Sequence, residues 1–242
     1  MQKRPDENGS DKVAQMMNAI RAYFSAMVHQ VALWRRPMAI DDLSSLADFC
    51  FAQSAHIAQT TLYGYLRTRA GLQHFNLFTD EKFAAMLRPA RSRLVLVCVD
   101  DLALFCTAVI GARAALPAPI LQELAAYMMR HAIRELADGD LPQSELDAYA
   151  HAFDARAAQA DWQAHAGVDY AFERSPQALV DLAPIVDILK ELDSEVVVNS
   201  MRFKWRGVRA AFRQRLDVDT LVARSGLGMA EQGMSDLKSR SV

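Results

Sequence analysis

Apolar residues recur at intervals of three and four positions along most of the chain, which is the pattern of helices that bury one face. The first helix is expected between Asp11 and Pro37. Its apolar positions are Val13, Met16, Ile20, Phe24, Met27, Val31 and Trp34. The second is expected to begin at a cap on Asp41 or Asp42 and to end at Gly71, because glycine readily adopts the conformation that terminates a helix.

Caps and prolines mark where the later helices begin and end. Thr79, which two acidic residues follow, is expected to cap one helix, and Pro89 should kink or break it. Ser175 is expected to cap another helix, with Pro176 at its first position. Pro184 should then break or kink the chain again.

Two short apolar runs, residues 94–99 and 195–199, could each form a strand when taken alone. Both continue into helical patterns, so we predict helix for both. Helices are also expected at residues 120–137, 144–167 and 194–216, with the alanine-rich stretch 144–167 at the periphery. The predicted fold is therefore all-α, a multi-helix bundle of about seven or eight helices with no significant β-sheet.

The helical pattern divides the chain into three parts. Residues 1–10 are polar and are expected to be disordered, residues 11–225 to form a single α-helical domain, and residues 226–242 to form a flexible tail. A hydrophobic fraction of 52% and a charged fraction of 23% indicate a globular chain rather than a disordered one. The net charge of −2 provides no overall attraction to nucleic acid or anionic lipid, so binding to either would need a local basic patch.

The cysteines and the N-terminus indicate a reducing compartment. Cys50, Cys98 and Cys106 stand in apolar surroundings, without the spacing of a metal site, and are expected to be buried. No apolar run follows the first basic residues, which favours the cytoplasm over secretion. Residues 94–112 could span a membrane by length, but two central acids would each cost about 2.5–3.5 kcal/mol there, so a buried helix is the better interpretation.

One helix carries an unusually varied polar row at the spacing of a single stripe. The row consists of Gln53, His56, Thr60, Tyr63 and Arg67. These side chains either face solvent or line a pocket in which His56 could titrate and the others could hydrogen-bond a ligand. The sequence is compatible with both interpretations.

Asp100 and Asp101 lie in the most apolar segment of the chain. Buried acids are normally paired, so one interpretation is an internal salt bridge that fixes the packing of this helix. The alternative is a catalytic acid or base with a raised pKa. In the enzyme that the sequence allows, His56 would be the general base, Tyr63 and Gln53 would orient the substrate, and one of the two aspartates would set the tautomer of the histidine.

The motifs of common enzymes and metal sites are absent from the sequence. It has no Glu-x-x-His pair, no His-Glu-x-x-His, no nucleophile elbow, no phosphate loop and no dinucleotide fingerprint. Asp147, His151 and Asp154 share one helical face and form only a weak candidate for a metal site. We therefore expect no cofactor and no metal, and we favour a protein that is not an enzyme.

The most distinctive feature is a basic segment near the C-terminus, residues 201–216, which contains six basic residues and no acid. Four of its arginines follow one another at helical spacing. We call them the arginine ridge: Arg202, Arg206, Arg209 and Arg213. A parallel apolar ridge lies one residue earlier and consists of Met201, Trp205, Val208 and Phe212.

This geometry suits an acidic protein partner, and an anionic lipid surface is the second candidate. Nucleic acid is disfavoured because the rest of the chain is acidic and contains no reader motif. We predict a non-enzymatic cytoplasmic interaction or regulatory protein that docks through the arginine ridge and Trp205. One competing interpretation is a core helix whose arginines pair with the chain's own acids, Asp100 and Asp101 among them. The other is an enzyme or small-ligand binder with its pocket between residues 51–71 and 94–111.

Self-association is the last expectation. The first helix carries apolar residues at strict four and three spacing, like a short coiled-coil seam. We expect a homodimer with Phe24, Val31 and Trp34 at its centre, unless the seam packs on the chain's own bundle.

Overall fold

The computed structural model describes residues 38–137, 139–167 and 172–227, and the part that begins at Ala39 forms one compact unit. The predicted first helix, its dimer seam and both predicted flexible ends lie outside the described residues, apart from the first two residues of the C-terminal tail. Within the described part every named element is a helix, and the one β-type pairing is an isolated bridge between Ile40 and Leu216. The predicted all-α fold is confirmed.

The elements follow one another with short connections. In chain order they are α2 (Leu43–Ala70), the short 3-10 helix η2 (Gly71–Gln73), α3 (His74–Thr79), α4 (Glu81–Ala114), α5 (Ala118–Leu136), α6 (Gln143–Ala158), α7 (Trp162–Ala166), α8 (Arg174–Leu182), α9 (Asp187–Arg215) and α10 (Val218–Ser225). Both apolar runs that could have been strands, residues 94–99 and 195–199, are helical, inside α4 and α9.

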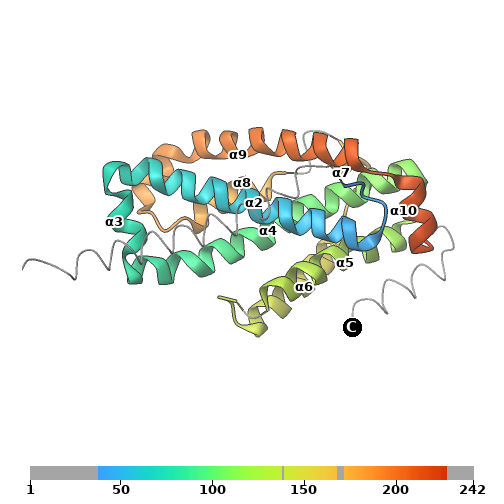
Figure 1. Ribbon diagram of the computed structural model, residues 1–242, viewed down its shortest axis with the longest axis horizontal. Helices are drawn as coiled ribbons and strands as arrows, with labels where there is room; N and C mark the ends of the chain where they lie inside the picture. Colours follow the sequence, from blue (N-terminus) through green and yellow to red (C-terminus); the bar gives the residue numbers. More distant parts are fainter. Residues whose placement is uncertain (1–37, 138, 168–171, 228–242) are drawn as a thin grey trace, which may run out of the picture. The chain divides into compact units, whose positions relative to one another are not determined.

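Helix α4 is the centre of the unit, where it packs against α2, α5, α7 and α8. Figure 1 shows α9 along one side next to α2, with α5 and α6 toward the opposite side. In the described part α4 is the one helix long and apolar enough to cross a membrane, and 94% of its most apolar window is buried inside the protein. The apolar surface of α4 is therefore used for internal packing.

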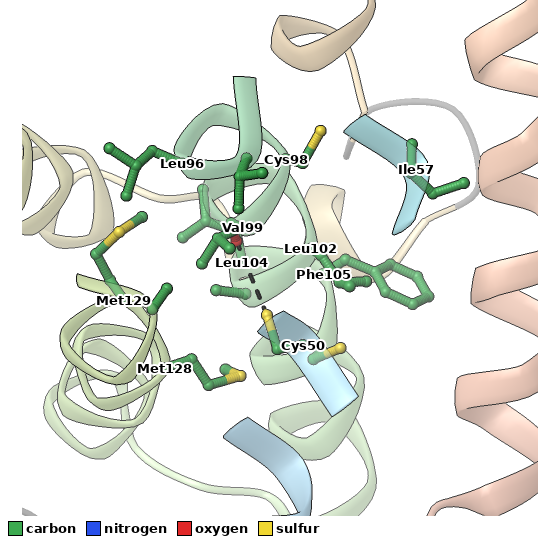
Figure 2. Close-up of a cluster of buried hydrophobic side chains, with 14 of the residues drawn as sticks. Cys50, Ile57, Leu96, Cys98, Val99, Leu102, Leu104, Phe105, Met128 and Met129 are labelled. Atoms are coloured by element: carbon green, nitrogen blue, oxygen red, sulfur yellow. Dashed lines mark hydrogen bonds between the residues drawn. The ribbon is translucent and has the colours of Figure 1, made fainter. Parts of the chain in front are cut away.

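The three cysteines are free thiols in this core, as predicted. The Cys50 thiol on α2 donates a long hydrogen bond to the Val99 carbonyl of α4, at 4.0 Å, among aliphatic and methionine side chains (Figure 2). Burial raises the pKa of all three thiols, so they stay protonated and behave as small apolar residues.

The ends of α2 form as its sequence predicts. The Asp42 carboxylate accepts a hydrogen bond from the Ser45 N–H at 2.7 Å, and the Ser45 hydroxyl lies 3.2 Å from the Asp42 N–H, which completes a capping box. Gly71 then adopts a φ of +53°, a conformation that a residue with a side chain would adopt only at a cost.

The predicted cap of α4 is wrong by one residue. Asp80 accepts the Phe83 N–H at 2.8 Å, whereas Thr79 is the last residue of α3 and bonds back to a carbonyl of that short helix. The helix also continues through Pro89 instead of breaking there. Pro89 deprives only the Ala85 carbonyl of its partner, and Ala85 is exposed, so water can hydrogen-bond that group.

The alanine-rich stretch forms two helices rather than one. α6 ends at Ala158, and Asp161 caps the short helix α7 by accepting the Ala164 N–H at 3.0 Å. Few residues of α6 are buried, which agrees with the expected peripheral position, whereas α7 packs against the central helix α4, so the expectation fails for the second half of the stretch.

Two helical glycines are expected to respond oppositely to alanine. A Cβ at Gly64 would meet no atom, so Gly64→Ala should raise the free energy of unfolding by about 0.5–1 kcal/mol through helix propensity. A Cβ at Gly111 would lie 2.7 Å from Cδ2 of buried Leu121, so Gly111→Ala should lower it by about 1–2 kcal/mol. Urea denaturation measures both. Equal stabilisation by the two variants would show that Leu121 moves aside freely.

Candidate functional site

The arginine ridge divides into two pairs on α9. Arg202 and Arg206 are exposed, whereas Arg209 is buried and Arg213 is half-buried. The guanidinium of Arg209 lies 5.5 Å from the centre of the Phe172 ring, and that of Arg213 lies 5.2 Å from the Phe105 ring. Arg213 also donates a hydrogen bond to the Ala166 carbonyl at 3.3 Å. The sequence predicted that all four arginines contact a partner. Of the four, Arg202 and Arg206 are exposed and can do so.

Trp205, predicted to dock a partner, is completely buried, and that prediction is wrong. Its indole N–H donates to the Ser175 hydroxyl at 3.0 Å, and its ring centre lies 4.6 Å from that of Phe172. The apolar ridge to which Trp205 belongs is the face that attaches α9 to the core. Its four large apolar residues at 4–3–4 spacing were the signal for this role.

The aromatic residue that α9 does expose is Phe203, which the sequence analysis missed. Its exposed fraction is 69%, and the Arg206 guanidinium lies 5.8 Å from its ring centre. Arg202 and Arg206 have no acidic partner within the described residues. The same face continues toward the start of α9 through the exposed residues Ile188, Leu192 and Val196. We call the face from Ile188 to Ala210 the outer face of α9.

The acid pair of α4 belongs to an internal network, as one of the two interpretations predicted. Asp100 is completely buried and is bonded by Arg156 of α6 and Arg174 of α8. Burial raises the pKa of Asp100, and the two guanidinium groups oppose that effect. The arginines of the ridge are not its partners, so that part of the prediction is wrong.

Asp101 holds the beginning of α8. Its carboxylate accepts the Ser175 N–H at 2.8 Å, and the Ser175 side chain adds a second hydrogen bond. The chain Trp205, Ser175, Asp101 therefore links α9, α8 and α4 through buried polar groups. Burial raises the pKa of Asp101 to about 7. The prediction that Ser175 caps α8 is wrong, because α8 begins one residue earlier, at Arg174. The N–H of Ser175 is hydrogen-bonded by Asp101 of α4.

The polar row of α2 does not converge on these acids. His56 is an exposed residue. The protein covers part of its side chain, and this cover, together with the nearby charge of Lys204, lowers its pKa. The Thr60 hydroxyl donates to the His56 carbonyl at 2.8 Å, and the Tyr63 ring packs on Phe78 with centres 5.4 Å apart. Gln53 is half-buried and Arg67 is exposed. The proposed catalytic set of His56, Tyr63, Asp100 and Asp101 is therefore not assembled.

A pocket does border α2, but against α9 rather than α4. It has a volume of about 410 Å³, and its wall includes Thr60, Tyr65, Asp193 and Lys204. The Arg69 guanidinium pairs with the Asp193 carboxylate at its edge. Apolar side chains such as those around Cys50 fill the contact between α2 and α4. The half-buried Lys204 amine and the hydroxyl groups could hold a small anion.

The weak metal candidate does not form a site. Asp147, His151 and Asp154 are all exposed, and Asp147 accepts a hydrogen bond from the Gln143 amide at 2.8 Å. Across the described ranges no three His, Cys, Asp or Glu residues are placed to hold an ion.

No known protein family, curated protein or solved structure matches this chain.

Proposed function

We propose that this protein is a non-enzymatic interaction or regulatory protein of the cytoplasm, which docks on an acidic protein surface through the outer face of α9. The observation that carries the proposal is an exposed phenylalanine between two exposed arginines. Phe203 has an exposed fraction of 69%, and neither Arg202 nor Arg206 has an acidic partner in the described part of the chain. Aromatic and arginine side chains are the residue types that most often dominate protein interfaces.

The site is smaller than the sequence pattern suggested. Arg209 and Arg213 pack on buried aromatic rings, so Arg202 and Arg206 supply the positive charge. The cation–π contact of Arg206 with Phe203 holds the aromatic and the charge together. An acidic partner with an apolar patch would be attracted by the arginines and would cover the ring. A purely charged surface would leave Phe203 exposed, so a partner without an apolar patch is disfavoured.

Site-specific photo-crosslinking in cells tests this function. With benzoylphenylalanine in place of Phe203, we expect a crosslinked adduct whose partner peptide, identified by mass spectrometry, is acidic and partly apolar. The same probe in place of Phe75 is the matched control, because Phe75 is exposed to a similar extent, 62%, on α3. Adding Arg202→Gln and Arg206→Gln should abolish the adduct at 203, because the attraction of the acidic surface is lost.

Both outcomes of this experiment are informative. These substitutions affect exposed side chains without described ion pairs, so the melting temperature should stay within a few degrees of that of the wild type. Equal crosslinking at positions 203 and 75, or an adduct that survives loss of both arginines, would rule out the proposed docking surface.

A further inference from the structure

We infer that the outer face of α9 binds the same face of a second copy of this chain, in antiparallel orientation. The inference rests on the proposed function and names the acidic partner: it is the first half of α9 itself. The exposed side of this helix carries its apolar and charged residues in an order that a second copy can complement.

A narrow stripe of three apolar residues and one polar residue runs along the face. Leu192, Val196, Asn199 and Phe203 follow at spacings of four, three and four, and all four are exposed. Leu192 and Val196 each have an exposed fraction of 72%. With a rise of about 1.5 Å per residue, the whole face from Ile188 to Ala210 extends over about 33 Å. A stripe with this spacing is the seam by which two helices pack side by side.

The charges on the face are segregated into two halves. Glu191 and Glu195 are exposed in the first half, and Arg202 and Arg206 are exposed in the second. None of these four residues has an ion pair in the described part of the chain. Each pair stands at i and i+4, where like charges repel one another within a single helix. An opposite charge from outside the helix would relieve both repulsions.

The helix dipole does not explain this segregation. It favours acids in the first turn and bases in the last turn and decays beyond them. Glu195 lies about two turns from the start of the 29-residue helix and Arg202 lies more than three turns from its end, so both are outside its first and last turns. The first and last turns already contain Asp187, Arg213 and Arg215. The charge order in the middle of α9 therefore fits an external partner that carries the reverse order.

A second copy of α9 carries that reverse order only when it runs antiparallel. With a two-fold axis near Asn199, Glu195 of each copy lies beside Arg202 of the other, and Leu192 and Val196 approach Phe203. A parallel pair would place acid against acid and base against base. Asn199 lies near the axis, where its side chain can hydrogen-bond Asn199 of the second copy. A polar residue within an apolar seam fixes the register of paired helices. Because only one helix from each copy is involved, we expect a micromolar dimer rather than a permanent one.

Charge exchange tests the pairing with the full-length chain. In sedimentation velocity, the wild type should show a concentration-dependent shift from monomer to dimer. Glu191→Arg with Glu195→Arg makes the whole face positive, and Arg202→Glu with Arg206→Glu makes it negative, so each variant alone should remain monomeric. An equimolar mixture of the two should form a heterodimer, because every contact is then between opposite charges. The fourfold exchange in one chain should restore the homodimer.

Three results would overturn the inference. They are a wild type that stays monomeric at high micromolar concentration, an all-positive or all-negative variant that dimerises on its own, and a mixture of the two variants that does not associate. Loss of association in a Phe24→Glu, Val31→Glu variant with retention in the charge variants would assign dimerisation to residues 11–37 instead. The crosslink at position 203 separates this inference from the proposed function: an adduct with a different acidic protein preserves the function and ends the self-pairing.

Discussion

Replacing both Arg156 and Arg174 by methionine is expected to lower the free energy of unfolding by about 3–5 kcal/mol near pH 8. Asp100 is completely buried, and these two guanidinium groups are its ionic partners. Its other oxygen, Oδ1, has no hydrogen bond in the described part. Without the arginines the carboxylate would be an uncompensated charge in the centre of the protein. At lower pH protonation of Asp100 should remove much of this loss, and urea denaturation near pH 8 and near pH 5 measures both effects.

The matched control removes the charge together with its partners. Adding Asp100→Leu to the two methionine substitutions should recover most of the lost stability, because a buried ion pair can be replaced by apolar residues at little cost. If the double variant loses less than about 1 kcal/mol, water or another group already solvates Asp100. If the triple variant is as unstable as the double, the arginines stabilise the fold by packing rather than by charge.

The fold could be predicted because its information is local. The three- and four-residue spacing in α4 and α9 continues across both apolar runs that could have been strands, so the sequence itself resolves the ambiguity. The α2 boundaries depend on a capping aspartate and a glycine within the helix's own sequence. Short helices were harder. α3 has six residues, and α10 has eight and is capped by Asp217, so neither contains enough turns for a periodic pattern.

The site could be predicted only in part, because its partners are distant in sequence. Burial of Asp100 follows from its apolar neighbours, but Arg156 and Arg174 lie 56 and 74 residues away. No local pattern distinguishes them from the ridge arginines. Trp205 and Phe203 illustrate a second limit. Two residues along a helix rotate by about 200°, so these aromatic residues lie on opposite faces, and tertiary packing decides which face is buried.

Asp101 is expected to make the protein less stable as the pH rises from about 4 to about 7. Its ordinary pKa is 3.8, and burial raises it to about 7 in the folded protein. The folded state therefore holds a proton that the unfolded chain releases, and protonation favours folding. The stabilisation is complete below about pH 4, declines up to about pH 7 and is absent above. The pKa difference corresponds to roughly 4 kcal/mol, and Asp100, whose pKa is also raised, acts in the same direction.

The variant Asp101→Asn should remove most of this pH dependence. Asparagine has the shape of the protonated acid and can still accept the Ser175 N–H, so the variant should match the wild type near pH 4.5 and exceed its stability near pH 8 by roughly 2–4 kcal/mol. Asp217→Asn is the opposing control. Hydrogen bonds from Thr220 lower the pKa of Asp217, so the contribution of Asp217 to stability is lost only in acid. The change in stability between pH 5 and pH 8 should therefore be the same in Asp217→Asn as in the wild type. A wild type with constant stability across that interval would show that Asp101 is ionised in the fold. A slope that persists in Asp101→Asn would assign the titration to Asp100.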